Sequence, residues 1–109
     1  MKEYKNKQGQ YHRTDGPAIE YDNGSKEWYI NGKLHREDGP AREYANGYKE
    51  WYINGKRHRT DGPACEYASG YKVWWVNGER VYSDNENNLS KFQVSESFKR
   101  SIVKYELAR

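Results

Sequence analysis

The chain has 109 residues, a formal net charge of +3 and a pI near 8.9. This charge is too small to require a polyanionic partner, and the length favours a single domain. Leu, Ile, Val and Phe supply only 14 residues, a fraction that by itself favours disorder. Eleven Tyr and four Trp reverse that expectation, because aromatic rings bury large areas and keep a polar group for water. We therefore expect a folded domain whose core consists mainly of aromatic rings.

The sequence shows no sign of export or membrane insertion. No apolar run approaches the length of a membrane-spanning helix, and residues Met1 to Gln10 lack the apolar stretch of a secretory signal. The single cysteine, Cys65, cannot form an internal disulfide. We expect a cytoplasmic protein, located in the host cytoplasm if the gene is viral.

An internal repeat dominates the sequence. The block from Trp28 to Tyr44 recurs from Trp51 to Tyr67, a spacing of 23 residues, with a partial copy at His12 to Tyr21 and a decayed one at Trp74 to Asn85. A fixed period of this length indicates stacked copies of one small unit that cannot bury its apolar side alone. The repeat therefore predicts a short solenoid.

Turn residues divide each repeat into short strands. Asn31-Gly32 and its copies Asn54-Gly55 and Asn77-Gly78 are typical of two-residue type I′ hairpins. Counting outward from the first turn, Ile30 pairs with Lys33, Tyr29 with Leu34 and Trp28 with His35. Further reversals are expected at Asp38-Gly39-Pro40, at Asp22-Asn23-Gly24 and at their copies. We predict a mainly β fold: a single-layer antiparallel meander of 23-residue β-hairpin repeats over residues 1–85.

The C-terminal segment departs from the repeat and reads as a helix. Ser90 suits the N-cap and Gln93 its capping-box partner, so a helix over about 91–108 is expected. One apolar stripe of this helix would cap the last hairpin, and residues 86–109 form the predicted capping unit. A second stripe, which includes Val103 and Leu107, is either partly exposed or a dimer or partner contact.

The repeat resembles the MORN (membrane occupation and recognition nexus) repeat. The resemblance covers Gly9 to Asn85 and rests on Trp-x-x-Asn-Gly-Lys, then a His, a Gly-bearing turn and an aromatic residue, as in the stretch from Trp51 to Tyr67. In this chain His-Arg-x-Asp-Gly-Pro-Ala stands in place of the family's Gly-x-Gly step. With this replacement the repeat is similar to repeats in phage and other viral genomes. The resemblance implies stacked β-hairpins and a scaffold that binds partners or dimerises.

Each repeat carries a His and an Asp, which is the raw material of a general base or a metal site. Equivalent residues of stacked hairpins lie about 10 Å apart, whereas ligands of one zinc ion lie within about 4 Å. No Ser has the surroundings of a nucleophile, so we expect no enzymatic activity, no metal and no cofactor. We interpret the recurring residues as framework, with each imidazole on the opposite Trp and the Arg and Asp of each loop paired: Trp28, His35, Asp38, Trp51, His58, Asp61 and Trp74.

Positions that differ between copies are the candidates for binding, because packing and turn geometry explain the identical ones. Tyr, Trp and Arg are enriched at interaction hot spots. The candidate binding residues are Arg42, Tyr48, Arg57, Tyr71, Trp75 and Arg80, with Val103 and Leu107 of the predicted helix.

These observations favour a non-enzymatic module that binds another protein, and a phage-encoded inhibitor of a host protein is one such role. A homodimer through the helix or a sheet edge is a further arrangement. The alternative function is a nucleic-acid or nucleotide-binding β-platform that uses exposed Tyr, Trp and Arg. Against it, Glu20, Glu43 and Glu66 recur as regularly as the arginines, which favours pairing of charges on the surface.

Overall fold

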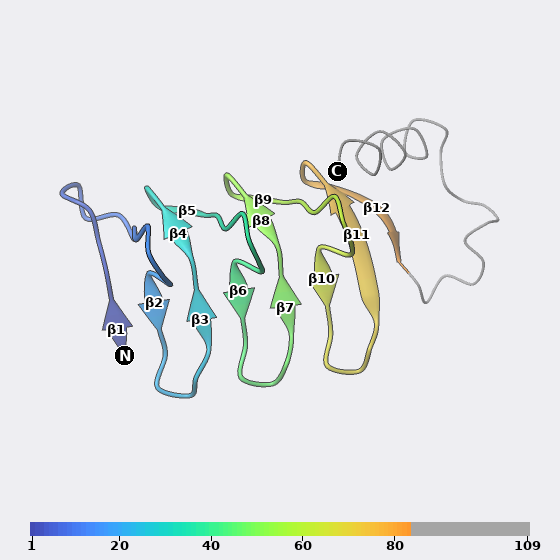
Figure 1. Ribbon diagram of the computed structural model, residues 1–109, viewed down its shortest axis with the longest axis horizontal. Helices are drawn as coiled ribbons and strands as arrows, with labels where there is room; N and C mark the ends of the chain where they lie inside the picture. The colour runs from blue at the N-terminus through green and yellow to red at the C-terminus, as the bar shows by residue number, and fades with distance from the viewer. Residues whose placement is uncertain (84–109) are drawn as a thin grey trace.

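A computed structural model describes residues 1–83, which form antiparallel β-structure without a helix (Figure 1). The mainly β class is therefore confirmed, whereas the predicted helix, with Val103 and Leu107, lies outside the described residues. One sheet has the order β1-β2-β3-β6-β7-β10-β11-β12. Its strands are β1 (Lys2–Glu3), β2 (Ile19–Glu20), β3 (Lys26–Glu27), β6 (Arg42–Glu43), β7 (Lys49–Glu50), β10 (Cys65–Glu66), β11 (Lys72–Val76) and β12 (Glu79–Ser83).

The Asn-Gly turns form as predicted. They close two small ladders, β4 (Tyr29–Ile30) with β5 (Lys33–Leu34) and β8 (Tyr52–Ile53) with β9 (Lys56–Arg57). The register in the first is Tyr29 opposite Leu34 and Ile30 opposite Lys33. Asn31 has a φ of 47° and Gly32 a φ of 82°, and a type I′ turn requires positive φ at both positions.

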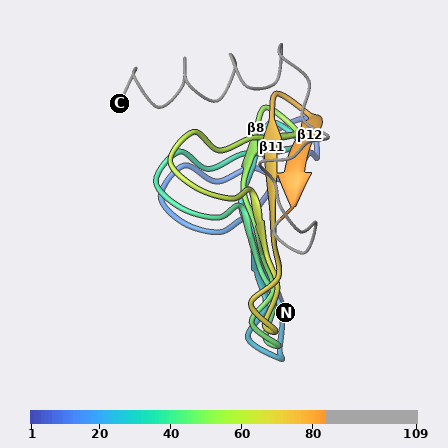
Figure 2. The ribbon, with the colours of Figure 1, turned by 90° about the vertical axis from the view of Figure 1, so that its right-hand side faces the viewer.

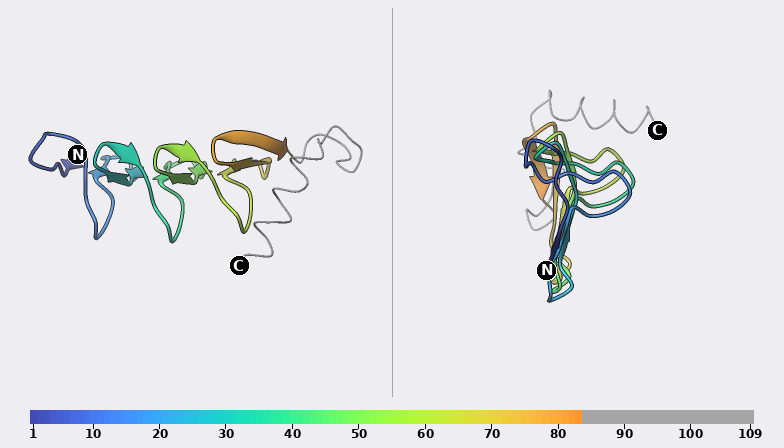
Figure 3. Two further views of the ribbon diagram at one scale, coloured as in Figure 1. Left: turned by 90° about the horizontal axis from the view of Figure 1, so that it is seen from above. Right: turned by 90° about the vertical axis from the view of Figure 1, so that its left-hand side faces the viewer.

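The chain path differs from a simple meander, because β5 and β9 do not join the main sheet. After β5, the loop of residues 35–41 leads the chain back to a position beside β3. There the amide of Trp28, directly after β3, donates to the carbonyl of Ala41, directly before β6, at 2.8 Å. As a result β6 pairs with β3 rather than with β5. These loops all project from one side of the sheet (Figures 2 and 3).

The turns at the other end of the strands also form as predicted. The Tyr21 amide donates to the Ser25 carbonyl at 2.9 Å, and Gly24 has a φ of 94°. The Asn23 side chain accepts from the Ser25 amide at 2.9 Å. This is the local Asx hydrogen bond that makes Asn and Asp frequent in turns.

Cross-strand register sorts the side chains onto two faces, because directly opposite residues share a face. One row runs Ile19, Glu27, Arg42, Glu50, Cys65, Val73 and Ser83. The neighbouring row alternates in charge: Lys2, Glu20, Lys26, Glu43, Lys49, Glu66 and Lys72. The first row is buried except for Arg42, which is half-buried, and we name its side the tyrosine face. We name the opposite side the loop face. It carries the charged row and the loop of residues 35–41 with its copies in the other repeats.

Candidate functional site

The six candidate binding residues within the described range all belong to the tyrosine face. Arg42 is in its buried row, and Tyr48 lies two residues before Glu50 of that row. Tyr71 and Trp75 flank Val73, while Arg57 and Arg80 pair across their hairpins with Tyr52 and Trp75. The structure thus brings together residues that the sequence singled out only because they differ between repeats.

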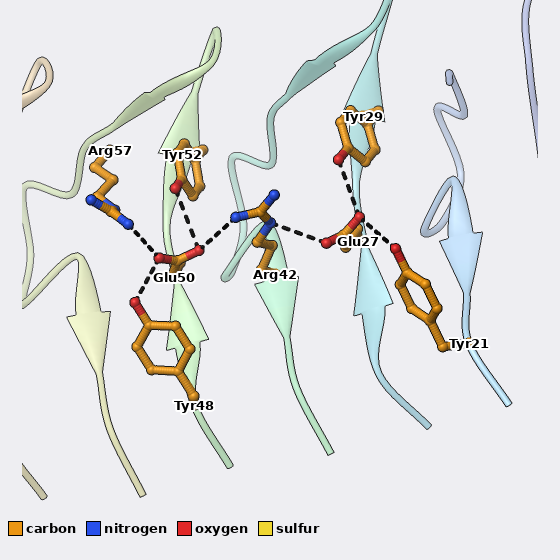
Figure 4. A network of polar contacts seen from close by, with 8 residues as sticks. All are labelled: Tyr21, Glu27, Tyr29, Arg42, Tyr48, Glu50, Tyr52 and Arg57. Atoms are coloured by element: carbon orange, nitrogen blue, oxygen red, sulfur yellow. Dashed lines mark hydrogen bonds and ion pairs between the residues drawn. The ribbon is translucent and has the colours of Figure 1, made fainter. Parts of the chain in front are cut away.

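Glu50 is the centre of a polar network on this face, although it is only 2% exposed. Its carboxylate accepts from the Tyr48 hydroxyl at 2.6 Å and from Nη2 of Arg57 at 2.8 Å. Nη1 of Arg42 donates at 3.2 Å and the Tyr52 hydroxyl at 3.4 Å (Figure 4). A buried carboxylate with four donors is satisfied on both oxygens.

The protonation of Glu50 follows from this geometry. Burial raises the pKa of the Glu50 carboxyl, but the hydrogen bonds from Tyr48, Arg57 and Arg42 outweigh burial. The pKa of Glu50 therefore lies below its usual value, and the group is ionised at neutral pH. Burial, followed by the bond to Glu50, raises the pKa of Tyr48, so its hydroxyl stays a donor.

Arg42 joins Glu50 to a second carboxylate in the preceding repeat. Its Nε lies 3.1 Å from Glu27, which also accepts from the hydroxyls of Tyr21 and Tyr29, each at 3.1 Å. Burial, together with the nearby Glu27, raises the pKa of Tyr21 to about 12. Two carboxylates thus face the guanidinium groups of Arg42 and Arg57, so the network is balanced in charge.

A run of tyrosine rings borders this network. The rings of Tyr44 and Tyr48 lie 5.5 Å apart, those of Tyr48 and Tyr67 4.5 Å, and those of Tyr67 and Tyr71 5.2 Å. Tyr44 is 37% and Tyr67 41% exposed. In the first repeat Ser25 occupies the position of Tyr48 and Tyr71, so the run begins at Tyr44 and belongs to the C-terminal half of the sheet.

Arg57 links this run to the last hairpin. Its guanidinium lies 4.9 Å from the centre of the Trp75 ring and 5.8 Å from that of Tyr52. Arg80, on the exposed start of β12, donates to the Ser83 hydroxyl at 3.1 Å. Arg57 and Trp75 are therefore half-buried contacts of the fold, whereas Arg80 extends the face outward.

On the loop face the framework residues make one repeated set of contacts. The guanidinium of Arg36 lies 3.9 Å from the centre of the Trp28 ring and donates to Asp38 at 3.0 Å and to the Pro40 carbonyl at 3.1 Å. Arg59 repeats this with Trp51, Asp61 and the Pro63 carbonyl. The predicted Arg–Asp pairing is confirmed, and the side chain over each of these indoles is the arginine. In the last copy the Tyr82 ring takes this place, 4.8 Å from Trp74.

The histidines connect successive repeats. Nδ1 of His35 accepts from the Asn54 amide at 3.0 Å, and His58 accepts in the same way from Asn77. Each imidazole therefore holds the hairpin turn of the following repeat. This contact was not predicted, because it depends on how one repeat sits on the next.

Sequence reasoning also missed Glu27 and Glu50. The available signal was the Lys-Glu-Trp triplet at 26–28 and 49–51, because alternation along a strand places the Glu on the face opposite to the Lys and the Trp. Within residues 1–83, no group of three or more His, Cys, Asp or Glu side chains is arranged to hold a metal ion. The same residues include no helix long and apolar enough to cross a membrane.

Comparisons with protein-family models, with curated proteins and with solved structures find no match to this chain.

Proposed function

We propose that the chain is a non-enzymatic, cytoplasmic module that binds another protein through the C-terminal half of its tyrosine face. In this proposal the sheet is a short solenoid of MORN-like hairpin repeats closed by a C-terminal helix. Inhibition of a host protein by a phage-encoded module is a role that fits such a surface.

The observation that carries the proposal is the segregation of variable residues. The loop face repeats the same Arg, Trp, Asp and His contacts, whereas the six described candidate binding residues, which change between copies, collect on the opposite face. Rings that contact one another while partly exposed lose little side-chain freedom on binding, which is typical of protein-binding hot spots.

Nucleic-acid binding is the second candidate, because a run of exposed rings could stack with bases. The charges favour protein. Arg42 and Arg57 are paired with Glu50 on the tyrosine face, and the lysines of the loop face alternate with glutamates. Arg42 and Arg57, the arginines beside the ring run, are therefore already paired with a carboxylate of the fold. A fall in affinity of about a thousandfold between 50 and 200 mM salt would instead favour nucleic acid.

Two equivalent tyrosines provide a matched test. Tyr67 belongs to the ring run, whereas Tyr21, exposed to a similar extent, has Ser25 beside it in place of a tyrosine. The wild type and both variants are used to capture proteins from a lysate treated with nuclease. We expect Tyr21→Ser to capture the same proteins as the wild type, and Tyr67→Ser to lose them. Thermal melts establish that both variants fold. Equal capture by all three proteins, or capture abolished by nuclease, would contradict the proposal.

A further inference from the structure

Two grooves cross the loop face, one between each pair of successive loops. The first has a volume of 790 Å³ and is floored by Trp28, Ile30 and His35. The second has a volume of 610 Å³ and is floored by Trp51, Ile53 and His58. Residues Arg36 to Asp38 line both grooves and form the rib between them. Each floor is half-buried, so the structure leaves two equivalent aromatic and aliphatic surfaces open to solvent.

The spacing of these grooves follows from the sheet. Strands β3 and β7 are separated by β6 alone, so equivalent residues lie two strand spacings apart, about 9.6 Å. A ligand that places one side chain in each groove must therefore repeat its orientation at about this distance.

A polyproline II helix has this period. It has three residues per turn and rises about 3.1 Å per residue, so the same side faces the sheet every 9.3 Å. In an extended strand the same side recurs at about 6.7 Å, and in an α-helix at about 5.4 or 10.5 Å. Grooves floored by aromatic rings are also the surfaces on which proline-rich segments dock.

Among the loops that form the groove walls, the central one carries an excess of negative charge. In the outer loops Arg13 is paired with Asp15 and Arg59 with Asp61, so each of these walls is balanced. In the central loop Arg36 is paired with Asp38. Glu37 on the central rib adds a second carboxylate, and its side chain is 83% exposed. A basic side chain on the ligand would complement this rib.

We propose that the loop face binds a basic, proline-rich segment of a partner protein in the polyproline II conformation, with one residue of every three entering a groove. This site is independent of the tyrosine face and does not rest on the function proposed for it. Glu37 interacts with the basic residue that crosses the rib, and Trp28, Ile30, Trp51 and Ile53 contact the prolines.

A synthetic peptide of four Pro-Pro-Arg triplets, labelled with a fluorophore, is the probe. In anisotropy titrations with the full chain we expect saturable binding. A peptide of the same composition with its arginines placed together cannot put a basic residue on the rib between two prolines in the grooves, and a helix-forming peptide of equal charge lacks the three-residue period. Both should bind at least about tenfold more weakly. Equal binding of either control peptide, or no saturation by the probe, overturns the proposal.

Variants locate the site. Glu37→Lys should weaken binding about tenfold, whereas Glu79→Lys, the same change on an exposed strand residue away from the grooves, should not. Ile53→Ser tests the apolar floor, with a thermal melt to show that it folds. In NMR spectra of the isotope-labelled wild type the probe should shift the indole N–H signals of Trp28 and Trp51. Shifts confined to Trp75 or the tyrosine face, or equal losses in the two Lys variants, would overturn the groove assignment.

Discussion

Replacing Glu50 with Val tests whether the buried network holds the sheet together. Val is the residue at the equivalent position of the next repeat, Val73, so its shape suits the row. In this variant Arg57 loses its carboxylate partner, and the hydroxyl of Tyr48 loses its acceptor. Arg42 keeps one partner, because Glu27 lies 3.1 Å from its Nε.

The expected loss of stability can be bracketed from this geometry. Removing one member of a buried ion pair costs about 3–5 kcal/mol. The side chain of Arg57 is 33% exposed, so water screens part of the uncompensated charge. We therefore expect Glu50→Val to lower the free energy of unfolding by about 2–3 kcal/mol. Urea unfolding followed by Trp fluorescence measures such a loss in a domain of ordinary stability, about 5–15 kcal/mol.

A second change should restore most of that loss. Leu34 is the equivalent of Arg57 in the preceding repeat, and the buried Nε of Arg57 makes no hydrogen bond in the described structure. Removing both charges therefore also removes an unsatisfied donor. The double variant Glu50→Val with Arg57→Leu should lie within about 1 kcal/mol of the wild type, a coupling of at least about 1 kcal/mol. Additive losses would refute the role given to this ion pair.

Three further changes probe the loop face and its turns. Gly55→Val should lower the free energy of unfolding by about 1–3 kcal/mol, because the backbone φ of +80° disfavours a β-branched residue although there is space for its side chain. Gly55→Asn should cost less, because Asn tolerates positive φ. Equal melting temperatures for the wild type and Gly55→Val would contradict the turn geometry. Burial lowers the pKa of His58 in the folded state, where its neutral Nδ1 accepts from the Asn77 amide. The contribution of His58 to stability should therefore be complete above about pH 6.5 and should be lost as the pH falls toward the folded-state pKa. The melting temperature of His58→Gln should depend less on pH over this range. A methyl group at Gly39 would lie 2.9 Å from the Arg36 guanidinium carbon, so Gly39→Ala should cost about 1–3 kcal/mol in urea unfolding and much less in an Arg36→Ala background.

Local features of the fold could be predicted from the sequence because they depend on a few neighbouring residues. Positive φ at Asn31 and Gly32 specifies the turn, and the turn specifies that Tyr29 pairs with Leu34. The Arg36–Asp38 pair lies within one loop for the same reason. Such contacts need no knowledge of how repeats stack.

Contacts between repeats could not be predicted in this way. The burial of Glu50 depends on the pairing of β6 with β7, which places Arg42 directly opposite. The bond from the Asn54 amide to His35 likewise depends on the offset between adjacent hairpins. Neither offset is encoded in the pattern of one repeat, so sequence reasoning places the histidine on its own Trp and treats the arginines only as candidate binding residues.

The two faces of the sheet differ in how strictly their side-chain contacts repeat from one copy to the next. Each histidine up to His58 holds the turn that follows it, and at the next equivalent position the chain has Val81, where this series of contacts stops. On the loop face a change to His35 or His58 therefore disturbs the turn of the neighbouring repeat, because the imidazole accepts from a backbone amide of that turn. The tyrosine face has no such rule, since Glu50 and Val73 occupy one equivalent position in successive repeats. Its residues can therefore differ from repeat to repeat while the histidine contacts of the loop face stay the same, which is the property that a partner-specific surface requires.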